Sequence, residues 1–521
     1  MTTTTSTTPK DSASGRATLE SVNPATGDVV GVHPVHGEAD VRAAVARARA
    51  SADWWAGLGF DGRKQVLTQW RGVITRRLAQ LCELVHQETG KPHGDAQLEC
   101  ALAIDHLAWA GSHAEKVLGR RRVSSGLLLA NQAASVEYLP MGVVGVIGPW
   151  NYPVFTPIGS IAYALAAGNT VVYKPSELTP GVGTWLADSL REVVPDHALL
   201  QVVTGYGETG AALCRAGVDK IAFTGSTATG KRVMAACAET LTPVVIEAGG
   251  KDALLVDEDA DLEAAADAAA WGAFSNAGQT CAGVERVYVH EQVHDRFVEL
   301  LAERARAVHA GTDVDAKIGP MTMPGQLDVV RRHVADALAH GGRAVVGGAE
   351  AVGDRFVQPT VLVDVPEDSE AVAEETFGPT VTVRKVRDMD EAVELTNGGK
   401  YGLGSAIYTA KRGDDLARRL RTGMTSINSV ISFAGVPSLP FGGVGDSGFG
   451  RIHGPEGLRE FAYAKAVTRT RFRAPLNLTT FDRTPAQDST LATILLALHG
   501  RASQLPKLPR RPLETIRGRA D

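Results

Sequence analysis

The strongest constraint on the fold is a regular alternation of short apolar segments and helical stretches beyond Pro140. Each short segment is rich in β-branched residues, as strands are. The segments are Val143–Ile147, Thr170–Tyr173, Leu199–Val203, Lys220–Phe223 and Val244–Ile246. Strands that alternate with helices form βαβ units, whose parallel strands share one sheet with helices on both faces. The alternation therefore predicts an α/β fold with a mostly parallel sheet.

Two further stretches of chain flank this alternation. Residues 40–119 have a helical pattern, and residues 251–450 read as a second α/β segment. The second segment opens with an Ala-rich helix that either Asp259 or Asp261 could cap, because a side-chain oxygen there accepts a bond from a free backbone N–H. A chain of 521 residues is too long for one compact core, so we expect two or three domains.

The remaining segments carry weaker signals. The N-terminus is rich in Thr and Ser and lacks the apolar core of a signal peptide, which predicts a disordered tail. No run of about 18 uncharged apolar residues occurs, which argues against a transmembrane helix and makes the cytoplasm the expected compartment. Arg122–Tyr138 could form a hairpin, Ala462–Phe472 reads as an isolated strand, and the residues after Arg473 look like an appendage.

Charge and cysteine usage restrict the class of partner. The formal net charge of −6 gives no electrostatic reason to expect nucleic acid, so small metabolites and cofactors are the expected partners. The five cysteines form no CxxC pair and no metal-ligand spacing, so no metal site is expected. Such a scattered set is typical of a reduced cytosolic protein, in which each thiol is either buried or reactive.

Two glycine-rich segments compete as the binding site for a phosphate group. Gly205–Gly210 matches GxGxxG after a strand but lacks the acidic residue expected about 20 positions later, so a plain turn is an equal alternative. Gly225–Lys231 nearly matches the P-loop motif, but Arg232 occupies the position of the Ser or Thr that binds Mg²⁺ in that motif. With Ser226 near the cap of the following helix, this second segment fits the pyrophosphate of a dinucleotide better.

Three polar residues are candidates for catalysis, and each has a structural alternative. Cys281 follows Gly278, where a left-handed turn could end a helix and direct the thiol into a cleft instead of the core. Glu247 follows a buried-looking strand, at the edge where open α/β sheets bind ligands, or it is a solvated strand end. Asn151 could present its amide to a developing oxyanion, or it is an ordinary turn residue.

Taken together, these segments resemble the aldehyde dehydrogenase superfamily from about Glu20 to Val467. Seven motifs stand in the family's order, and Cys281 and Glu247 have the family's separation of 281 − 247 = 34 residues. The motifs are GPWNYP, YKPSELTP, FTGSTATG, IEAGGK, SNAGQTCAG, EETFGP and PFGGVGDSGFGR. Ala248 departs from the family, which usually has Leu after the base, and Val444–Asp446 replaces a more frequent basic residue.

The resemblance implies a subunit of three parts that assembles as a homodimer or homotetramer. A Rossmann-type cofactor domain would comprise residues 19–121 and 141–249, and an α/β catalytic domain residues 250–450. A β-strand oligomerisation flap would comprise residues 122–140 and 462–473. A tail over residues 1–18 and a C-terminal extension over residues 474–521 complete the chain.

The resemblance also implies the chemistry. Cys281 would attack a small-molecule aldehyde, with Glu247 as the base and Asn151 and the Cys281 backbone N–H holding the oxyanion. Hydride would pass to a nicotinamide, and water activated by Glu247 would hydrolyse the thioester. A CoA-acylating enzyme is the nearest alternative, but it needs no hydrolytic base. A non-catalytic relative is disfavoured because all three residues are present.

The cofactor residues follow by position in the motifs. Lys174 and Glu177 would reach the adenosine ribose, and Glu375 and Phe377 the nicotinamide ribose. The other predicted cofactor contacts are Trp150, Ser176, Gly207, Gly225, Ser226 and Gly230. The carboxylate of Glu177 would repel a 2′-phosphate, which predicts a preference for NAD⁺ over NADP⁺.

The substrate and the C-terminal extension are the least constrained parts. The loop Ser429–Ser438, with Phe433, is expected to line a tunnel for aliphatic or aromatic aldehydes, with succinate semialdehyde as an alternative. In the extension, the apolar run Leu491–Leu498 precedes a segment, Arg501–Asp521, with six basic and two acidic residues. A docked helix with a solvated tail is one interpretation, and peripheral contact with an anionic membrane is the other.

Overall fold

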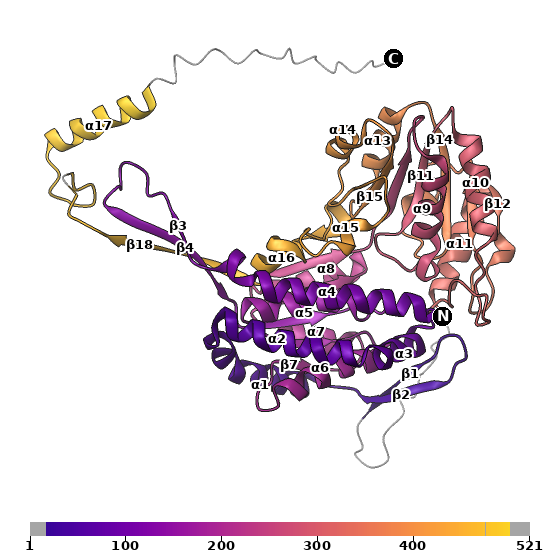
Figure 1. The fold of residues 1–521 in the computed structure, drawn as a ribbon, viewed down its shortest axis with the longest axis horizontal. Coiled ribbons are helices and arrows are strands. Elements are labelled where there is room, and N and C mark those ends of the chain that lie inside the picture. The colour runs from indigo at the N-terminus through magenta and orange to yellow at the C-terminus, as the bar shows by residue number, and fades with distance from the viewer. Residues whose placement is uncertain (1–16, 475, 501–521) are drawn as a thin grey trace. The chain divides into compact units, whose positions relative to one another are not determined.

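A computed structural model describes residues 17–474 and 476–500 (Figure 1). Within these ranges the chain forms two compact units. The first contains residues 17–119 and 137–465, and the second contains residues 120–136 with 466–474 and 476–500. In the described part of the chain, no helix combines the length and the apolar character that crossing a bilayer requires.

The alternation beyond Pro140 folds into a six-stranded sheet with the strand order β17-β9-β8-β5-β6-β7. Its strands are β5 (Val143–Ile147), β6 (Thr170–Lys174), β7 (Leu200–Val202), β8 (Lys220–Gly225), β9 (Val244–Ala248) and β17 (Gly448–Phe449). The first five pair in parallel, which confirms the prediction, and β17 adds an antiparallel edge beside β9. The intervening helices are α5 (Phe155–Ala167), α6 (Pro180–Val193), α7 (Gly207–Arg215) and α8 (Thr227–Ala238).

The helical pattern of residues 40–119 is confirmed as four helices, of which the first packs on the strands of this sheet and the other three pack on α5, α6 and one another (Figure 1). They are α1 (Glu38–Gly57), α2 (Gly59–Arg76), α3 (Leu78–Thr89) and α4 (His93–Leu118), preceded by the antiparallel pair β1 (Thr18–Val22) and β2 (Val29–Pro34). Two buried tryptophans fix the packing through their ring N–H groups. Trp55 donates to the carbonyl of Leu165 over 2.9 Å, and Trp70 donates to Ser189 Oγ over 2.8 Å.

The second α/β segment forms a seven-stranded sheet with the order β12-β13-β14-β11-β10-β15-β16, parallel except for the pair β12 and β13. Its strands are β10 (Asp252–Val256), β11 (Val284–His290), β12 (Arg343–Val346), β13 (Thr360–Val363), β14 (Thr380–Val386), β15 (Ser405–Tyr408) and β16 (Ser426–Ile427). Its helices are α9 (Leu262–Phe274), α10 (His294–Arg306), α11 (Gln326–Ala339), α12 (Glu370–Ala373), α13 (Met389–Gly398), α14 (Gly413–Arg419) and α15 (Ser432–Gly435). Asp261, not Asp259, caps α9, since its side chain accepts from the N–H of Ala264 over 3.1 Å.

The remaining strands form a three-stranded sheet with the order β18-β4-β3. β3 (Arg121–Val123) and β4 (Gln132–Pro140) are the two antiparallel strands of the predicted hairpin. β18 (Ala462–Thr470) is not isolated as predicted, because it hydrogen-bonds to β4. Two helices complete the described chain, α16 (Gly454–Glu460) before β18 and α17 (Pro485–His499) after it. The domain boundaries and the role of this sheet in assembly remain predictions.

Candidate active site

Cys281 follows α9 at the end of a strained turn. The helix ends at Phe274, and the 3₁₀ turn Ser275–Gly278 carries three left-handed residues, Asn276, Ala277 and Gly278, with φ values of 52°, 55° and 70°. Gly278 is required there, because an added Cβ would lie 2.1 Å from the carbonyl oxygen of Gly378. After this turn, Cys281 lies at the edge of the first core and lines a cavity. The other four cysteines of the chain are buried, and Cys281 is only partly buried.

The thiol lies where two cavities adjoin. One has a volume of about 240 Å³ and mainly apolar walls, which include Leu98, Phe155 and Trp271. The other has a volume of about 660 Å³ and more polar walls, to which β8, β9 and α11 contribute residues. Cys281 and Glu247 line both cavities. The structure therefore brings together the two residues that the motif spacing singled out.

Glu247 is a buried carboxyl group at the end of β9. Its side chain is 3% exposed, which excludes the alternative of a solvated strand end. Neither of its oxygens has a hydrogen-bond partner within the described residues. Burial, only partly offset by Thr224 and Cys281 nearby, raises the pKa of Glu247 to about 7. A carboxyl group with that pKa can take up and release a proton near neutral pH.

The thiol of Cys281 is held in its neutral form. Burial, followed by the negative charges of Glu247 and Glu375, raises the pKa of Cys281 well above its ordinary value. Because a thiolate, not a thiol, is the nucleophile, this sulfur needs a proton acceptor before it can react. Glu247 lies at the same junction and has a pKa suited to that task.

Asn151 is buried between the loop after β5 and the turn before Cys281. Its Nδ2 group donates to the carbonyl of Gln279 over 2.9 Å. Its own backbone carbonyl accepts from Lys91 Nζ over 2.7 Å and from Asn276 Nδ2 over 3.1 Å. These bonds fix the amide of Asn151 close to the loop that carries Cys281.

Sequence reasoning did not identify the buried ion pair behind Asn151. Lys91 Nζ lies 2.7 Å from Glu99 Oε2, and the two side chains are 1% and 0% exposed. The other oxygen of Glu99 accepts from the N–H groups of Val154 and Phe155 at the start of α5, over 2.7 and 3.2 Å. One signal was present in the sequence, since Glu99 lies three residues after Ala96 on the buried face of α4, where an apolar residue is the rule.

Removing one member of this pair is expected to destabilise the fold. Lys91→Met should lower the free energy of unfolding by about 3–5 kcal/mol, because the Glu99 carboxylate stays buried without its counter-charge. Lys91→Met/Glu99→Gln removes both charges and keeps an acceptor for the α5 N–H groups, so it should be more stable than Lys91→Met. Urea denaturation of the three proteins measures the difference, and a double variant no more stable than Lys91→Met would contradict this account.

The predicted cofactor residues gather around a cleft at the carboxyl ends of the first sheet. A cavity of about 770 Å³ there is lined by seven of them, Trp150, Lys174, Ser176, Glu177, Gly207, Gly225 and Ser226. Ser226 caps α8 as predicted, since its Oγ accepts from the N–H of Thr229 over 3.3 Å. Gly207 and Gly225 line the same cavity, so both glycine-rich segments reach it. Gly230 does not line it, and its Cβ position lies 3.1 Å from Ile246, which allows α8 to pack closely on β9.

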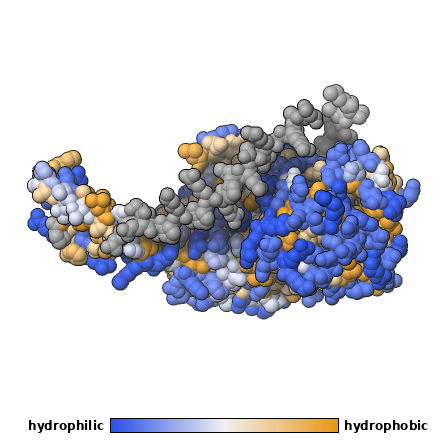
Figure 2. Space-filling view, turned by 90° about the horizontal axis from the view of Figure 1, so that it is seen from above, coloured by the Kyte–Doolittle hydropathy of each residue, from blue (hydrophilic) through white to orange (hydrophobic). Residues whose placement is uncertain are grey.

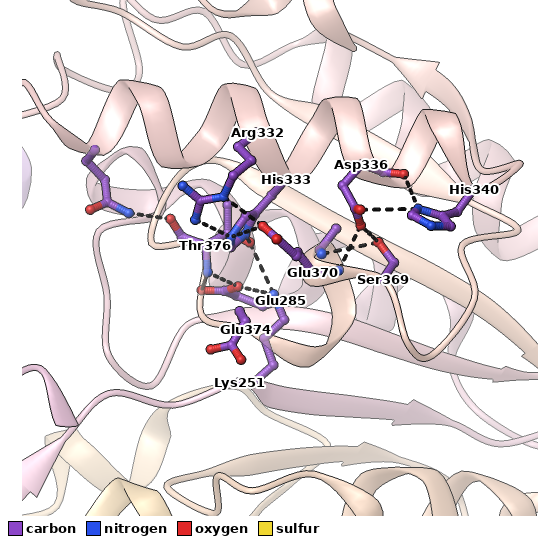
Figure 3. Close-up of polar contacts among 12 residues, drawn as sticks. Lys251, Glu285, Arg332, His333, Asp336, His340, Ser369, Glu370, Glu374 and Thr376 are labelled. Carbon is purple, nitrogen blue, oxygen red and sulfur yellow. Dashed lines mark hydrogen bonds and ion pairs between the residues drawn. The ribbon is translucent and has the colours of Figure 1, made fainter. Parts of the chain in front are cut away.

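The last two predicted cofactor residues, Glu375 and Phe377, line the cavity beside Cys281 together with Trp150. The segment that carries them is held by a buried polar network centred on Thr376 (Figure 3). Glu285 accepts from the N–H groups of Thr376 and Phe377 over 2.8 and 3.0 Å, and Lys251 pairs with Glu285. Sequence reasoning identified neither Lys251 nor Glu285.

Two further contacts complete this network. His333 Nδ1 lies 3.1 Å from the hydroxyl of Thr376, which Lys251 also reaches over 3.2 Å (Figure 3). The N–H of Gly250 donates to Glu375 Oε1 over 3.0 Å, and burial raises the pKa of Glu375 to about 8. The orientation of the 375–377 segment is therefore set by groups packed behind it.

The walls of the smaller cavity bear on the kind of substrate. The predicted loop Ser429–Ser438 contributes Val430 and Ile431, but Phe433 is not among the lining residues and packs against Phe441. Among the described residues that line this cavity there is no Arg and no Lys. A buried carboxylate needs a counter-charge or several hydrogen bonds, so this cavity is poorly suited to an anionic substrate tail.

Comparison with known proteins places these features in a family. The family model described as "Aldehyde dehydrogenase family" matches residues 10–467. A 4,4'-diapolycopene aldehyde oxidase of Methylomonas sp is 36% identical over 494 residues, covering 94% of this chain and 93% of that protein. Because 94% of 521 residues is about 490, that match cannot end before about residue 490 and so extends into the C-terminal extension.

Other relatives differ in their named substrates and cofactors. A Mycobacterium tuberculosis (strain ATCC 25618 / H37Rv) protein, provisionally named succinate-semialdehyde dehydrogenase [NADP(+)] 2, is 36% identical over 455 residues, covering 86% of this chain and 87% of its own. The crystal structure of an NAD-dependent aldehyde dehydrogenase from Sinorhizobium meliloti has a TM-score of 0.85 and 34% identity, covering 90% of this chain and 94% of its own.

Proposed function

The chain belongs to the aldehyde dehydrogenase family, and from this premise we propose that it oxidises an apolar aldehyde to the carboxylic acid with NAD⁺. The observation that carries the proposal is the position of Cys281. It is the one cysteine that is only partly buried, and it shares both of its cavities with the unpaired carboxyl group of Glu247. The family acts on small-molecule aldehydes and is generally oligomeric, and we propose a homodimer or homotetramer in the cytoplasm.

In the proposed reaction the sulfur of Cys281 forms and later breaks a bond to the aldehyde carbon. Glu247 takes the proton of the thiol, directly or through a water, and the thiolate attacks the carbonyl. Asn151 Nδ2 and the backbone N–H of Cys281 donate to the oxygen as it becomes negative. The carbon then loses hydride, which NAD⁺ would accept, and becomes a thioester, and Glu247 releases the proton of the thiol to solvent. Glu247 then removes a proton from the water that hydrolyses the thioester, and this proton passes to the leaving sulfur. This step releases the acid and restores the thiol.

The cleft along the first sheet fits the cofactor that accepts this hydride. The N-terminus of α8 and its cap Ser226 offer backbone N–H groups and a positive dipole end to a pyrophosphate. Lys174 and Glu177 line the same cavity and would hold the adenosine ribose, and Glu375 and Phe377 would hold the nicotinamide ribose. NAD⁺, when bound, supplies the hydride acceptor.

Hydrolysis is proposed over transfer of the acyl group to CoA. An enzyme that passes its thioester to CoA needs no base to activate water, whereas Glu247 is buried beside the sulfur with a pKa of about 7. Product analysis should show free acid without CoA, and no acyl-CoA when CoA is added. Acid formation that depends on CoA would favour the CoA-acylating alternative.

The walls of the small cavity support an apolar substrate and weigh against succinate semialdehyde. We expect kcat/KM for pentanal to exceed that for succinate semialdehyde, which has similar length, by at least about 10²-fold. The distal carboxylate would lie in a mainly apolar cavity, with no Arg or Lys among the lining residues that the structure describes. The rate of NADH formation is measured with pentanal and with succinate semialdehyde, and also with decanal and benzaldehyde. A higher kcat/KM for succinate semialdehyde than for pentanal would exclude the apolar assignment.

The preference for NAD⁺ is expected to depend on Glu177. Its carboxylate lies 3.4 Å from Lys174 Nζ at the cofactor cavity and would repel a 2′-phosphate. Glu177→Gln should raise kcat/KM for NADP⁺ relative to NAD⁺ by about tenfold. Glu239 lines the same cavity but is paired with Arg215 over 3.1 Å, so Glu239→Gln is the matched control and should leave the ratio unchanged. A wild-type enzyme with equal or better kcat/KM for NADP⁺ would refute the preference.

A further inference from the structure

Cys281 is the second residue of a tight turn. The N–H of Gly283 donates to the carbonyl of Thr280 over 2.9 Å and closes a β-turn over residues 280–283. The turn is closely packed, because a Cβ at Gly283 would lie 2.9 Å from that same carbonyl oxygen. Since the turn begins at Thr280, the direction of the Cys281 side chain depends on how Thr280 is held.

Two neighbouring side chains of the loop after β5 hold the two residues that precede Cys281. Asn151 Nδ2 donates to the carbonyl of Gln279 over 2.9 Å. The hydroxyl of Tyr152 lies 3.0 Å from Thr280 Oγ1, so these two hydroxyl groups form a hydrogen bond. Consecutive residues of one loop thus bind consecutive residues of the other.

The amide of Asn151 has two N–H groups. Within the described residues its Nδ2 makes the one bond to Gln279, which leaves the second N–H for a carbonyl oxygen bound at Cys281. Asn151 and Cys281 line the same cavity. A shift of the turn would move the sulfur relative to this N–H, and a misplacement of about 1 Å can reduce a rate by about 10²-fold.

The ring of Tyr152 is fixed by Lys91. Lys91 Nζ lies 4.3 Å from the centre of the ring, and it also donates to the carbonyl of Asn151 over 2.7 Å. Because the Lys91 side chain is only 1% exposed, its attraction to the ring is stronger than it would be in water. The hydroxyl of Tyr152 therefore has a fixed position beside Thr280.

The two hydroxyl groups lie in mainly apolar surroundings. Hydrophilic residues predominate on the face of the molecule that Figure 2 shows, where water can bind them. Thr280 is buried, by contrast, and both Tyr152 and Thr280 line the mainly apolar cavity beside Cys281. Burial raises the pKa of Tyr152, so its hydroxyl stays protonated near neutral pH. Each hydroxyl is the partner of the other, so the pair needs no bond to the substrate.

We propose that Tyr152 and Thr280 are positioning residues, whose hydrogen bond holds the sulfur of Cys281 in line with the free N–H of Asn151. The inference rests on the proposed function, because that function gives the sulfur and the amide their roles. It adds two residues that act through Cys281 and that neither form a bond to the substrate nor transfer a proton.

Two variants that each remove one hydroxyl test the proposal. Tyr152→Phe keeps the ring over Lys91, and Thr280→Val keeps the shape of the side chain. Each should lower kcat by about tenfold, whereas KM for pentanal and for benzaldehyde should change by less than about twofold. Thr280→Ser keeps a hydroxyl and should retain at least about half of the wild-type kcat. The rate of NADH formation at saturating NAD⁺ is measured for each protein.

Double variants show whether the two hydroxyl groups act together and through Asn151. Tyr152→Phe/Thr280→Val should have about the same kcat as either single variant, because both changes break the same bond. In a protein that already carries Asn151→Ala, Tyr152→Phe should change kcat by less than about twofold, since no amide is left to align with the sulfur. A general loss of stability would not produce these two dependences.

The matched control is Tyr288→Phe. Tyr288 is also a buried tyrosine beside a cation, and its hydroxyl donates to Glu367 over 2.9 Å. It lines none of the three cavities around Cys281 and the cofactor cleft, so this variant should keep the wild-type kcat.

Wild-type kcat in both Tyr152→Phe and Thr280→Val, or a change of KM confined to one aldehyde, would overturn the inference. So would effects of the two changes that multiply to about 10²-fold in the double variant. In each of these cases an inactive Cys281→Ala would leave the proposed function standing. If Cys281→Ala were fully active, the proposed function and this inference would fail together.

Discussion

Cys281→Ala is expected to lower kcat for aldehyde oxidation by about 10⁴-fold or more, because the proposed reaction passes through a bond to this sulfur. The change removes one sulfur atom at the junction of the two cavities, where the side chain is only partly buried. Binding of NAD⁺ should persist, since the cofactor cavity lies along the first sheet. NADH formation under saturating aldehyde measures the rate, and fluorescence titration measures cofactor binding.

Cys237→Ala is the matched control for this experiment. Cys237 is 1% exposed and belongs to the core beneath α8, so its loss should affect stability more than kcat. If Cys281→Ala retained wild-type kcat, or if Cys237→Ala lost activity to the same extent while remaining folded, the assignment of the nucleophile would be wrong.

Glu247→Gln is expected to lower kcat by about 10²- to 10⁴-fold, because the amide cannot accept the proton of the thiol or of the hydrolytic water. The pH profile gives a second test. With a pKa of about 7, Glu247 is protonated and inactive at low pH, so kcat/KM of the wild type should rise as pH passes through about 7. In Glu247→Gln this rise should be absent. A variant that kept the wild-type profile would show that another group is the base.

The same substitution should increase stability above neutral pH. Burial raises the pKa of Glu247 from 4.5 to about 7, so ionisation of this group makes the folded state less stable as pH rises from 4.5 to 7. The loss reaches about 3 kcal/mol above pH 7. Urea denaturation at pH 8 should therefore show Glu247→Gln to be more stable than the wild type, although it is far less active. A less stable variant would contradict the burial argument.

The fold was predictable where local pattern and tertiary pairing agree. The five parallel strands lie within two residues of the expected bounds, because each is a β-branched run between helices. β17 could not be foreseen, because its two residues, Gly448 and Phe449, carry no strand signal and pair only because β9 presents a free edge. The pairing of β18 with β4 has no local signal either, since about 320 residues separate them, and only the resemblance grouped the two segments in one flap.

The site was predictable to the extent that its groups belong to motifs. The resemblance led to Cys281 and Glu247, and the structure places both at one junction. Lys91 and Glu99 were missed because their partners follow 55 to 60 residues later in the chain, and no local pattern encodes such a contact. Membership of a motif does not by itself predict contact with the cleft, since Gly230 serves the packing of α8 on β9.

The close approach of Gly278 to the carbonyl of Gly378 has a practical consequence for protein engineering. This contact packs the loop that carries Cys281 against the loop that carries Phe377. Neither loop can therefore be redesigned without disturbing the other. Val430 and Ile431, which line the apolar cavity, take no part in this close approach. Libraries aimed at new aldehydes should therefore vary these two positions, where side-chain volume can change while the reacting groups keep their alignment.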